Sequence, residues 1–284
     1  MRSTFSGINT VVRGIYAQQM SLDTVGHNIA NASTEGYSRQ RVNLVTTLPE
    51  VVYGGVGALQ VGTGVAIESV IRARDVFMDR QYWKESSSLG YGQTAQTNFN
   101  QIEGIFNDEI PDLGIQTVLN NFWQSWQTLA GNASNDSART AVRERGAELV
   151  DAIQHARRQL NDMVANVNQT LATKVSQINE MASEIYSLNR QIANIEVGGR
   201  AHANDLRDRR DLLVDKLSQM MNVNVYEDSN HCYSVQVSDV TLVDGAGFTP
   251  LALNDPSTSM DPDYGFEVRY LVVAGTNRRV KFTN

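Results

Sequence analysis

Several features that would indicate chemistry or a particular compartment are scarce in this chain, and cysteine is the first of them. Cys232 is the only cysteine among 284 residues, which excludes an internal disulfide and a cysteine-rich zinc site. The histidines are scattered and lack the paired spacing of metal-binding motifs; they are His27, His155, His202 and His231. We therefore expect no metal site and no cofactor.

Concentrated positive charge and long apolar runs are also lacking. The formal net charge is -7 and there is no basic run, so a surface that holds nucleic acid by neutralising phosphates has little to be made from. No run of about 18 residues is apolar. The start, MRSTFSGINTVVRG, has arginines without the apolar core of a signal peptide. We expect no nucleic-acid partner and no membrane insertion, and the protein either stays inside the cell or leaves by a route without such a peptide.

Proline, the strongest helix breaker, occurs five times and is absent from residues 50–110 and 112–249, so long helices are permitted. Apolar residues recur every three or four positions from Leu149 to Ile195, with polar residues between them. A helix from near Ser137 to the Gly198-Gly199 pair would hold about 60 residues and be roughly 90 Å long. Such a helix indicates a bundle or a loose coiled coil.

Shorter helices are predicted at 73–108, 113–130 and 204–221. The second has an apolar face, and we expect the three tryptophans of the chain to pack in a helix-bundle core; they are Trp83, Trp123 and Trp126.

The helix at 204–221 is rich in charge. Asn204 is a candidate N-cap, and the opposite charges of Asp205/Arg209 and Arg207/Asp211 are four residues apart. We interpret these charges as a solvated face. The apolar residues expected to face inward are Leu206, Leu213, Leu217 and Met220.

From Val223 the period of the pattern changes to two. The stretches VNVYED, YSVQVSD and FEVRYLVV alternate apolar and polar residues between turn-forming residues. A β-rich region is therefore predicted from Val223 to the last residue, and we place a domain boundary near 222.

At the other end, residues 4 to 32 are predicted to form a helix with one apolar stripe and a polar face that has few charges. The stripe has nothing nearby in the sequence to be buried against. The stretch GHNIANASTEGYSRQRV then ends the helix at Ser33 to Gly36 and begins an extended segment at Tyr37. An ordinary helix end would explain its glycine and serine, but not the whole arrangement GHNIANxxTxGYSRQ.

Pairs of aspartates in the charged helix could act as general acid and base, but they lack a glycine-rich pocket loop and a polarising partner. The glycines of YGGVGALQVGTGV do not have the dinucleotide-binding spacing and indicate turns and a hairpin instead. We expect that the protein is not an enzyme.

The stripe followed by NIANxxTxGY resembles the axial proteins of the bacterial flagellum, which are the rod, hook and hook-associated proteins. The stretches GYSRQRV, GTGV at 62–65 and IRARDVFMDRQY at 71–82 are similar to the hook-associated protein 1 (FlgK) family. The similarity continues through LNNFWQSWQTLAGN, INEMASEIYSLNRQI and NDLRDRRDLLVDKLS, and so covers nearly the whole chain to about residue 226.

This resemblance implies a mainly α fold with some β structure: an N-terminal axial helix, a long-helix bundle like the helical domain of flagellin, and part of a β-rich outer domain. The corresponding segments are 1–36 for the axial assembly helix, 37–72 for an extended hairpin connector, 73–222 for the long helices and 223–284 for the outer domain. Relatives are nearly twice as long, so we expect the chain to be an N-terminal part and its helical body to need a helix from the missing half.

The resemblance also implies where subunits meet. In this family the terminal segments pair as helices inside the assembled tube. The expected intersubunit core consists of Ile8, Ile15, Leu22, Val25 and Ile29, and the family turn motif of Gly26, Asn28, Asn31, Gly36, Tyr37, Arg39 and Gln40.

The function implied is a structural subunit that joins hook to filament outside the cell, exported by the flagellar type III apparatus without a cleaved signal peptide. Its implied partners are copies of itself in a ring, the hook protein, the next hook-associated protein or filament subunits, and an export chaperone. Two alternatives remain open: another axial protein of the hook or distal rod, or a secreted coiled-coil adhesin or effector.

Overall fold

The computed structural model describes residues 5–54, 57–106, 114–199, 201–255, 267–276 and 278–281. The chain divides into two compact units. Unit 1 comprises Met1–Ser88, Ile178–Pro250 and Lys281–Asn284, and unit 2 comprises Leu89–Gln177 and Leu251–Val280.

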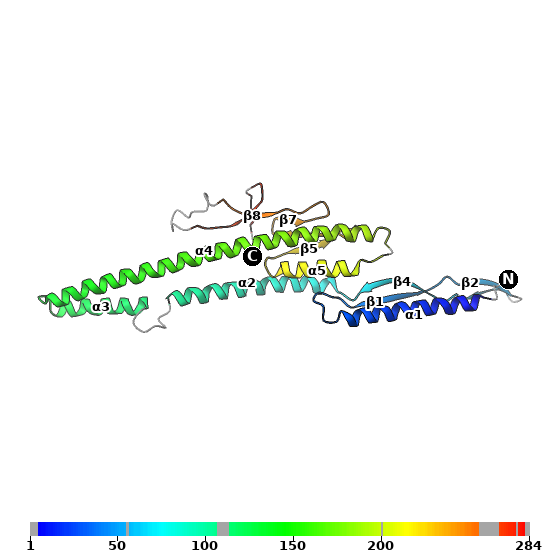
Figure 1. The fold of residues 1–284 in the computed structure, drawn as a ribbon, viewed down its shortest axis with the longest axis horizontal. Helices are drawn as coiled ribbons and strands as arrows, with labels where there is room; N and C mark the ends of the chain where they lie inside the picture. The colour runs from blue at the N-terminus through cyan, green and yellow to red at the C-terminus, as the bar shows by residue number, and fades with distance from the viewer. Residues whose placement is uncertain are drawn as a thin grey trace. The chain divides into compact units, whose positions relative to one another are not determined.

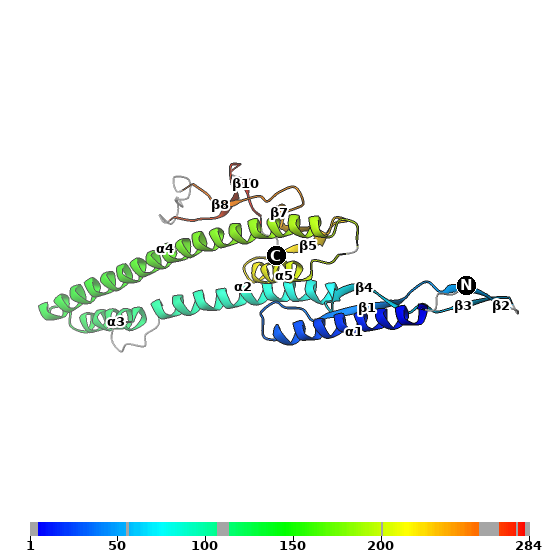
Figure 2. The same ribbon diagram turned by 45° about the vertical axis from the view of Figure 1, so that its right-hand side comes forward.

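Unit 1 begins with helix α1 (Ser6–Ala30), which lies along a two-stranded antiparallel ribbon (Figure 1). The ribbon pairs β1 (Gln40–Thr46) with β4 (Val65–Arg72), and its register is irregular between Asn43 and Leu44. Between these strands the chain forms a second hairpin from β2 (Glu50–Gly54) and β3 (Gly57–Val61), which continues beyond the N-terminal end of α1 (Figure 2).

The remainder of unit 1 contains its apolar core. The first part of α2 (Val76–Phe106), the last part of α4 (Asp136–Ile195) and α5 (Asn204–Ser218) belong to it. A three-stranded antiparallel sheet has the order β5 (Asn224–Glu227), β6 (Tyr233–Val237) and β7 (Val240–Val243). Side chains that are less than 2% exposed include Ala182, Ile185, Ile192, Val214, Leu217, Val235, Leu242 and Val243.

Unit 2 contains the remainder of α2, the first part of α4 and α3 (Ile115–Gly131). Its antiparallel sheet has the order β10 (Arg278–Arg279), β9 (Leu271–Val273) and β8 (Leu251–Leu253). Along α4, Val150, Ile153 and Val167 of this unit are more than 40% exposed, whereas Ile178, Ile185 and Ile192 in unit 1 are buried. The apolar stripe of α4 is therefore covered best in its C-terminal third.

The predicted fold class, mainly α with long helices and additional β strands, is confirmed. The longest helix has 60 residues, as its pattern predicted, and it ends before Gly198 and Gly199, which adopt φ angles of 93° and 71°. Such left-handed conformations are easily adopted only by glycine.

The expectation for the tryptophans is confirmed for Trp83 and wrong for two others. Trp83 is 4% exposed, but Trp123 and Trp126 are 60% and 47% exposed because nothing among the described residues of unit 2 covers that side of α3. The third predicted strand is short: β9 begins at Leu271, and Phe266 lies outside the described residues. Residues 4, 107, 108 and 113, at the predicted ends of helices, also lie outside them.

Candidate assembly surface

Helix α1 exposes its large apolar side chains. The five residues predicted for an intersubunit core are all more than half exposed, from 51% to 71%; they are Ile8, Ile15, Leu22, Val25 and Ile29. A shallow hollow of about 530 Å³ lies on this helix, and its lining carries no charge. Its lining residues are Val11, Gly14, Ile15, Gln18, Gln19 and Leu22.

The opposite face of α1 is made of small residues, and Ala17 and Thr24 on it are buried. The hydroxyls of Thr10, Ser21 and Thr24 donate hydrogen bonds to backbone carbonyls four residues earlier, at 3.1, 2.9 and 2.8 Å. These bonds satisfy the hydroxyls within the helix, so the small face can pack on the ribbon. Among the described residues, the packing of α1 therefore uses its small face, and its large apolar side chains stay exposed.

A side-chain amide connects the end of α1 to the ribbon. Asn28 Nδ2 donates to the carbonyl of Gln40, and Asn28 Oδ1 accepts from the backbone N–H of Gln40 and from the hydroxyl of Tyr37, each at 2.8 Å. Three bonds from one amide fix the distance between the helix and the start of β1. Asn31 stabilises the turn by donating to the His27 carbonyl and accepting from the Thr34 hydroxyl.

Gly36 fixes where the chain reverses. Its φ is 80°, and a Cβ on it would lie 2.9 Å from Cβ of Leu212 on α5, so both the backbone and the packing require glycine. Two members of the predicted motif have no such packing role. A Cβ on Gly26 would meet nothing within 4 Å, and Arg39 is exposed, although its carbonyl accepts a bond from Ala73 N–H.

Three carboxylates on α5, which we call the acidic row, face the ribbon: Asp205, Asp208 and Asp211. Asp208 accepts the backbone N–H of Ser38 at 3.0 Å and Nη1 of Arg72 at 2.8 Å. The same Nη1 lies 2.6 Å from Asp211 Oδ2. Asp208 and Asp211 are 5% and 1% exposed, so these are buried, charge-assisted bonds.

The predicted cap at Asn204 is wrong. Ala203 occupies the N-cap position, and Asn204 Nδ2 donates to the carbonyl of Val70 at 2.8 Å and to Gln40 Oε1 at 3.3 Å. Gln40 Nε2 in turn donates to Asp205 at 2.9 Å. The start of α5 is thus bonded to both strands of the ribbon.

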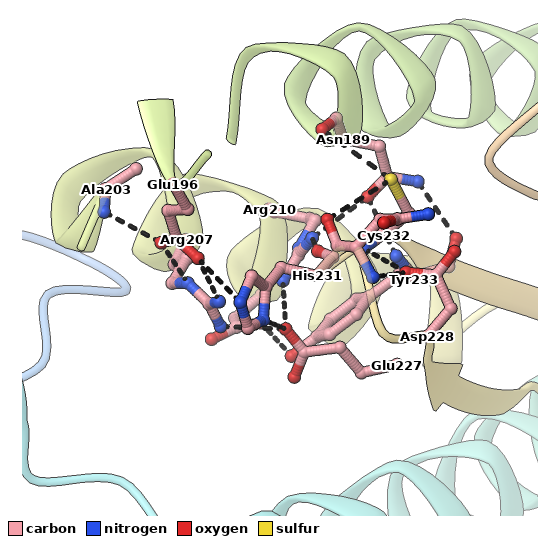
Figure 3. A network of polar contacts seen from close by, with 12 residues as sticks. Asn189, Glu196, Ala203, Arg207, Arg210, Glu227, Asp228, His231, Cys232 and Tyr233 are labelled. Atoms are coloured by element: carbon pink, nitrogen blue, oxygen red, sulfur yellow. Dashed lines mark hydrogen bonds and ion pairs between the residues drawn. The ribbon is translucent and has the colours of Figure 1, made fainter. Parts of the chain in front are cut away.

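The basic residues of α5 contact α4 and the sheet (Figure 3). Arg207 binds Glu196 in a bidentate manner, with Nε donating to Oε1 at 2.7 Å and Nη2 to Oε2 at 2.6 Å. Its Nη1 donates to Glu227 Oε1 at 2.9 Å. Burial raises the pKa of Glu196, but the hydrogen bonds from Arg207 and from the N–H of Ala203, together with nearby positive charge, outweigh it and lower this pKa to about 2.

Arg210 is fully buried. Its Nη1 donates to Asn189 Oδ1 at 3.0 Å and to the carbonyl of His231 at 2.6 Å, and its guanidinium lies 3.5 Å from the centre of the Tyr233 ring. Burial lowers the pKa of Arg210 and raises that of Tyr233, whose hydroxyl donates to Asp211 at 2.8 Å.

A further carboxylate of α5 reaches the start of α2. Asp215 accepts Nε1 of Trp83 at 2.6 Å and lies 3.5 Å from Nη2 of Arg74. Burial raises the pKa of Asp215, and the Trp83 bond offsets part of that shift. Cys232 is buried beside this network, its thiol 3.8 Å from the carbonyl of Asn189, and burial raises the pKa of that thiol.

The interpretation of the α5 charges as a solvated face is confirmed for Asp205 and Arg209, whose side chains are 70% and 66% exposed, and wrong for those that are buried. Asp208, Arg210 and Asp211 are buried. The predicted pairs were Asp205/Arg209 and Arg207/Asp211, and neither is an ion pair among the described residues. Asp205 contacts Gln40, and Arg209 pairs with Glu184. The inward turn of Leu217 is confirmed, at 0% exposure. Charge spacing in one helix could not reveal this, because the partners are distant in sequence; Arg72 is 139 residues from Asp211.

Within the part of the chain that the structure describes, no three histidines, cysteines or acids gather in a way that could bind a metal ion. None of the described helices is long and apolar enough to cross a membrane.

Two family models match the chain. The model for the flagellar hook-associated protein FlgK helical domain matches residues 99–281, and that for the flagella basal body rod protein matches residues 8–37. The first match includes α3, α4 and α5, and the second covers α1 with its turn.

Known proteins agree with these matches. Flagellar hook-associated protein 1 of Bacillus subtilis is 42% identical over 79% of this chain and 45% of its own length. The protein of the same name from Salmonella typhimurium is 32% identical over 86% of this chain and 44% of its own length. The solved structure of the flagellar hook junction protein FlgK from Burkholderia pseudomallei superimposes with a TM-score of 0.56 at 29% identity, covering 72% of this chain and 36% of that one. The chain thus spans less than half the length of these proteins.

Proposed function

This chain belongs to the family of the flagellar hook-associated protein FlgK, and from that premise we propose that it is a structural subunit of the junction between hook and filament. In this role it is part of the extracellular flagellum, acts by assembly and has no catalytic task. Four segments would divide this role among them. They are the axial helix at 1–36, the connector at 37–72, the helical body at 73–222 and the outer-domain portion at 223–284.

The observation that carries the proposal is the outward orientation of the apolar face of α1. Monomeric proteins rarely expose a continuous apolar face, and such a face usually marks an association site. Because the internal packing of α1 already uses its small face, an interface with neighbouring subunits needs no rearrangement of the helix. Ile15, Leu22 and Ile29 would form its centre, with Ile8 and Val25 beside them.

The proposed partners follow from a place between hook and filament. Copies of this chain would form a ring, the hook protein would lie on one side, and the next hook-associated protein or filament subunits on the other. Export by the flagellar type III apparatus, with a chaperone that covers apolar segments, belongs to the same proposal.

The alternatives fit less of the chain. A hook or distal-rod subunit agrees with the match of residues 8–37 to the rod model, but the FlgK helical-domain model matches residues 99–281. A secreted coiled-coil adhesin or effector would use a long α4 but would not need the Asn28 and Gly36 contacts of the turn.

The test is electron microscopy of flagella after deletion of the gene. We expect hooks without filaments, and flagellin unpolymerised in the medium. Complementation with Leu22→Ser combined with Ile29→Ser should fail to restore filaments although the variant is exported, whereas Asp23→Ser on a neighbouring position of α1 should restore them. Normal filaments in the deletion strain would refute the junction role.

A further inference from the structure

Arg210 on α5 is the largest of the fully buried side chains, and its hydrogen bonds use only some of its N–H donors. Nη1 donates to Asn189 Oδ1 and to the carbonyl of His231 (Figure 3). Nε and Nη2 are also buried, and they have no hydrogen-bond acceptor among the residues that the structure describes. Buried polar groups in folded proteins are almost always hydrogen-bonded, so these two nitrogens need an acceptor.

Nε and Nη2 lie on one edge of the guanidinium, which we call the Arg210 edge, and their N–H groups point in the same direction. The centre of the Tyr233 ring lies 3.5 Å from Cζ of Arg210. This ring attracts the positive charge, but it offers no oxygen that could accept the two N–H groups. A buried donor without an acceptor is unfavourable, because it has given up its hydrogen bonds to solvent.

Glu227 on β5 is close to the Arg210 edge but does not bind it directly. Its Oε1 lies 3.7 Å from Nη2 of Arg210, which is too long for a hydrogen bond. The same oxygen accepts Nη1 of Arg207 at 2.9 Å and lies 3.6 Å from Nδ1 of His231, and these contacts hold it in place. A polar contact longer than about 3.5 Å is one in which a water molecule can lie between the two groups.

We propose that the Arg210 edge and Glu227 Oε1 form a binding site for one ordered water molecule, which links α5 to β5. The water accepts the N–H groups of Nε and Nη2 with its two lone pairs and donates one hydrogen to Glu227. Buried waters make about three hydrogen bonds, and these three partners agree with that number. Helix α5 is thus bonded to β5 by two routes, directly through Arg207 and through the water.

The charges around the site favour a neutral ligand. The carboxylates of Glu227 and Asp211 both act on Arg210, so an anion at its edge would be repelled by them. A cation would be repelled by Arg210 itself and by Arg207. The side chains of Glu227 and His231 are 32% and 42% exposed, so water reaches the site from that side. The inference concerns contacts within unit 1 and does not rest on the proposed junction role.

The first test is a crystal structure of the purified chain at a resolution that shows ordered water, with bromide soaked into a second crystal. We expect a water oxygen within about 3.2 Å of Nε and Nη2 of Arg210 and of Glu227 Oε1, and no anomalous signal from bromide there. Three results would each overturn the inference: a protein oxygen bonded directly to both nitrogens, bromide in that position, or no density within hydrogen-bonding distance of either nitrogen.

The second test detects the water in solution, through cross-relaxation between water and the Nε proton of Arg210 in the isotope-labelled chain. The variant Arg210→Lys assigns this proton, because its signal is missing there. In the rotating frame, a long-lived water gives a cross peak of opposite sign to that of simple proton exchange. We expect this sign for Arg210. The Nε proton of Arg209, which pairs with Glu184 on the exposed side of the same helix, should show exchange alone.

The matched control is Tyr233→Phe. It removes a hydroxyl whose exchanging proton can relay magnetisation from bulk water to Arg210, and which donates to Asp211 in the unaltered chain. The cross peak should persist in this variant with its sign unchanged. Loss of the peak in Tyr233→Phe, or its absence in the unaltered chain, would mean that no water is bound at the Arg210 edge.

Discussion

Helices α1 and α5 combine composition and burial in opposite ways. The first has an apolar stripe that is exposed, with Leu22 and Ile29 each at 71%, and the second carries charged residues that are buried, with Arg210 at 0% and Asp211 at 1%. Elementary patterning predicts the reverse for both. The difference teaches that local patterning does not decide burial. An apolar face can stay exposed, and charged side chains such as Asp208 and Asp211 can be buried where they contact a cation from a distant segment.

The largest effect on the free energy of unfolding is expected at Arg210. Replacing it by alanine removes the cation from Asn189, the His231 carbonyl and the Tyr233 ring, and breaking a buried charged network costs about 3–5 kcal/mol. We expect a loss of that size in the free energy of unfolding, measured with urea. The control is Arg209→Ala on the same helix, which should change it by no more than about 0.5 kcal/mol. Equal values for the two variants would mean that the buried network does not stabilise the fold.

A smaller effect is expected from titrating Glu196. Because its folded pKa of about 2 lies below the ordinary value of 4.5, its contribution is complete above about pH 4.5 and is lost as the pH falls toward 2. That contribution is on the order of 2–3 kcal/mol. Glu196→Gln should therefore lower stability at pH 7 and flatten its fall in acid. If the free energies of unfolding of the unaltered chain and of Glu196→Gln fall in parallel over about three pH units, from pH 5 to pH 2, this expectation is contradicted.

The smallest effect on stability is expected at the stripe of α1. Leu22→Ser alters an exposed side chain, so the free energy of unfolding of the monomer should change by no more than about 0.5 kcal/mol, while self-association measured by sedimentation falls. Ala17→Leu on the buried small face is the contrasting variant, since it should weaken the packing of α1 on the ribbon. A large stability loss from Leu22→Ser would mean that the stripe serves the monomer.

The parts of the fold that follow from local pattern could be predicted. The 60-residue length of α4 and the position of the sheet after residue 222 are set by period and by the glycines that end the helix. The exposure of Ile15 and Leu22 agrees with a stripe that has no partner in its own neighbourhood.

The joint between α5 and the ribbon could not be predicted in this way. A carboxylate such as Asp211 has the same local pattern whether its partner is water or Arg72. The bonds of Asn28 and the contact of Gly36 with Leu212 depend on how distant segments pack, and periodicity contains no information on that. The family motif contains those residues, but it did not distinguish them from Gly26 and Arg39, which have no comparable packing role.

The burial of Cys232 has a practical consequence for labelling. A thiol with a raised pKa carries little thiolate at neutral pH, and thiolate is the form that alkylating reagents attack. A second cysteine placed on the exposed side of α1, at Gln18, would therefore react selectively with a fluorophore without removal of the native one. The chain is thus already suited to fluorescence measurements that follow the environment of this helix.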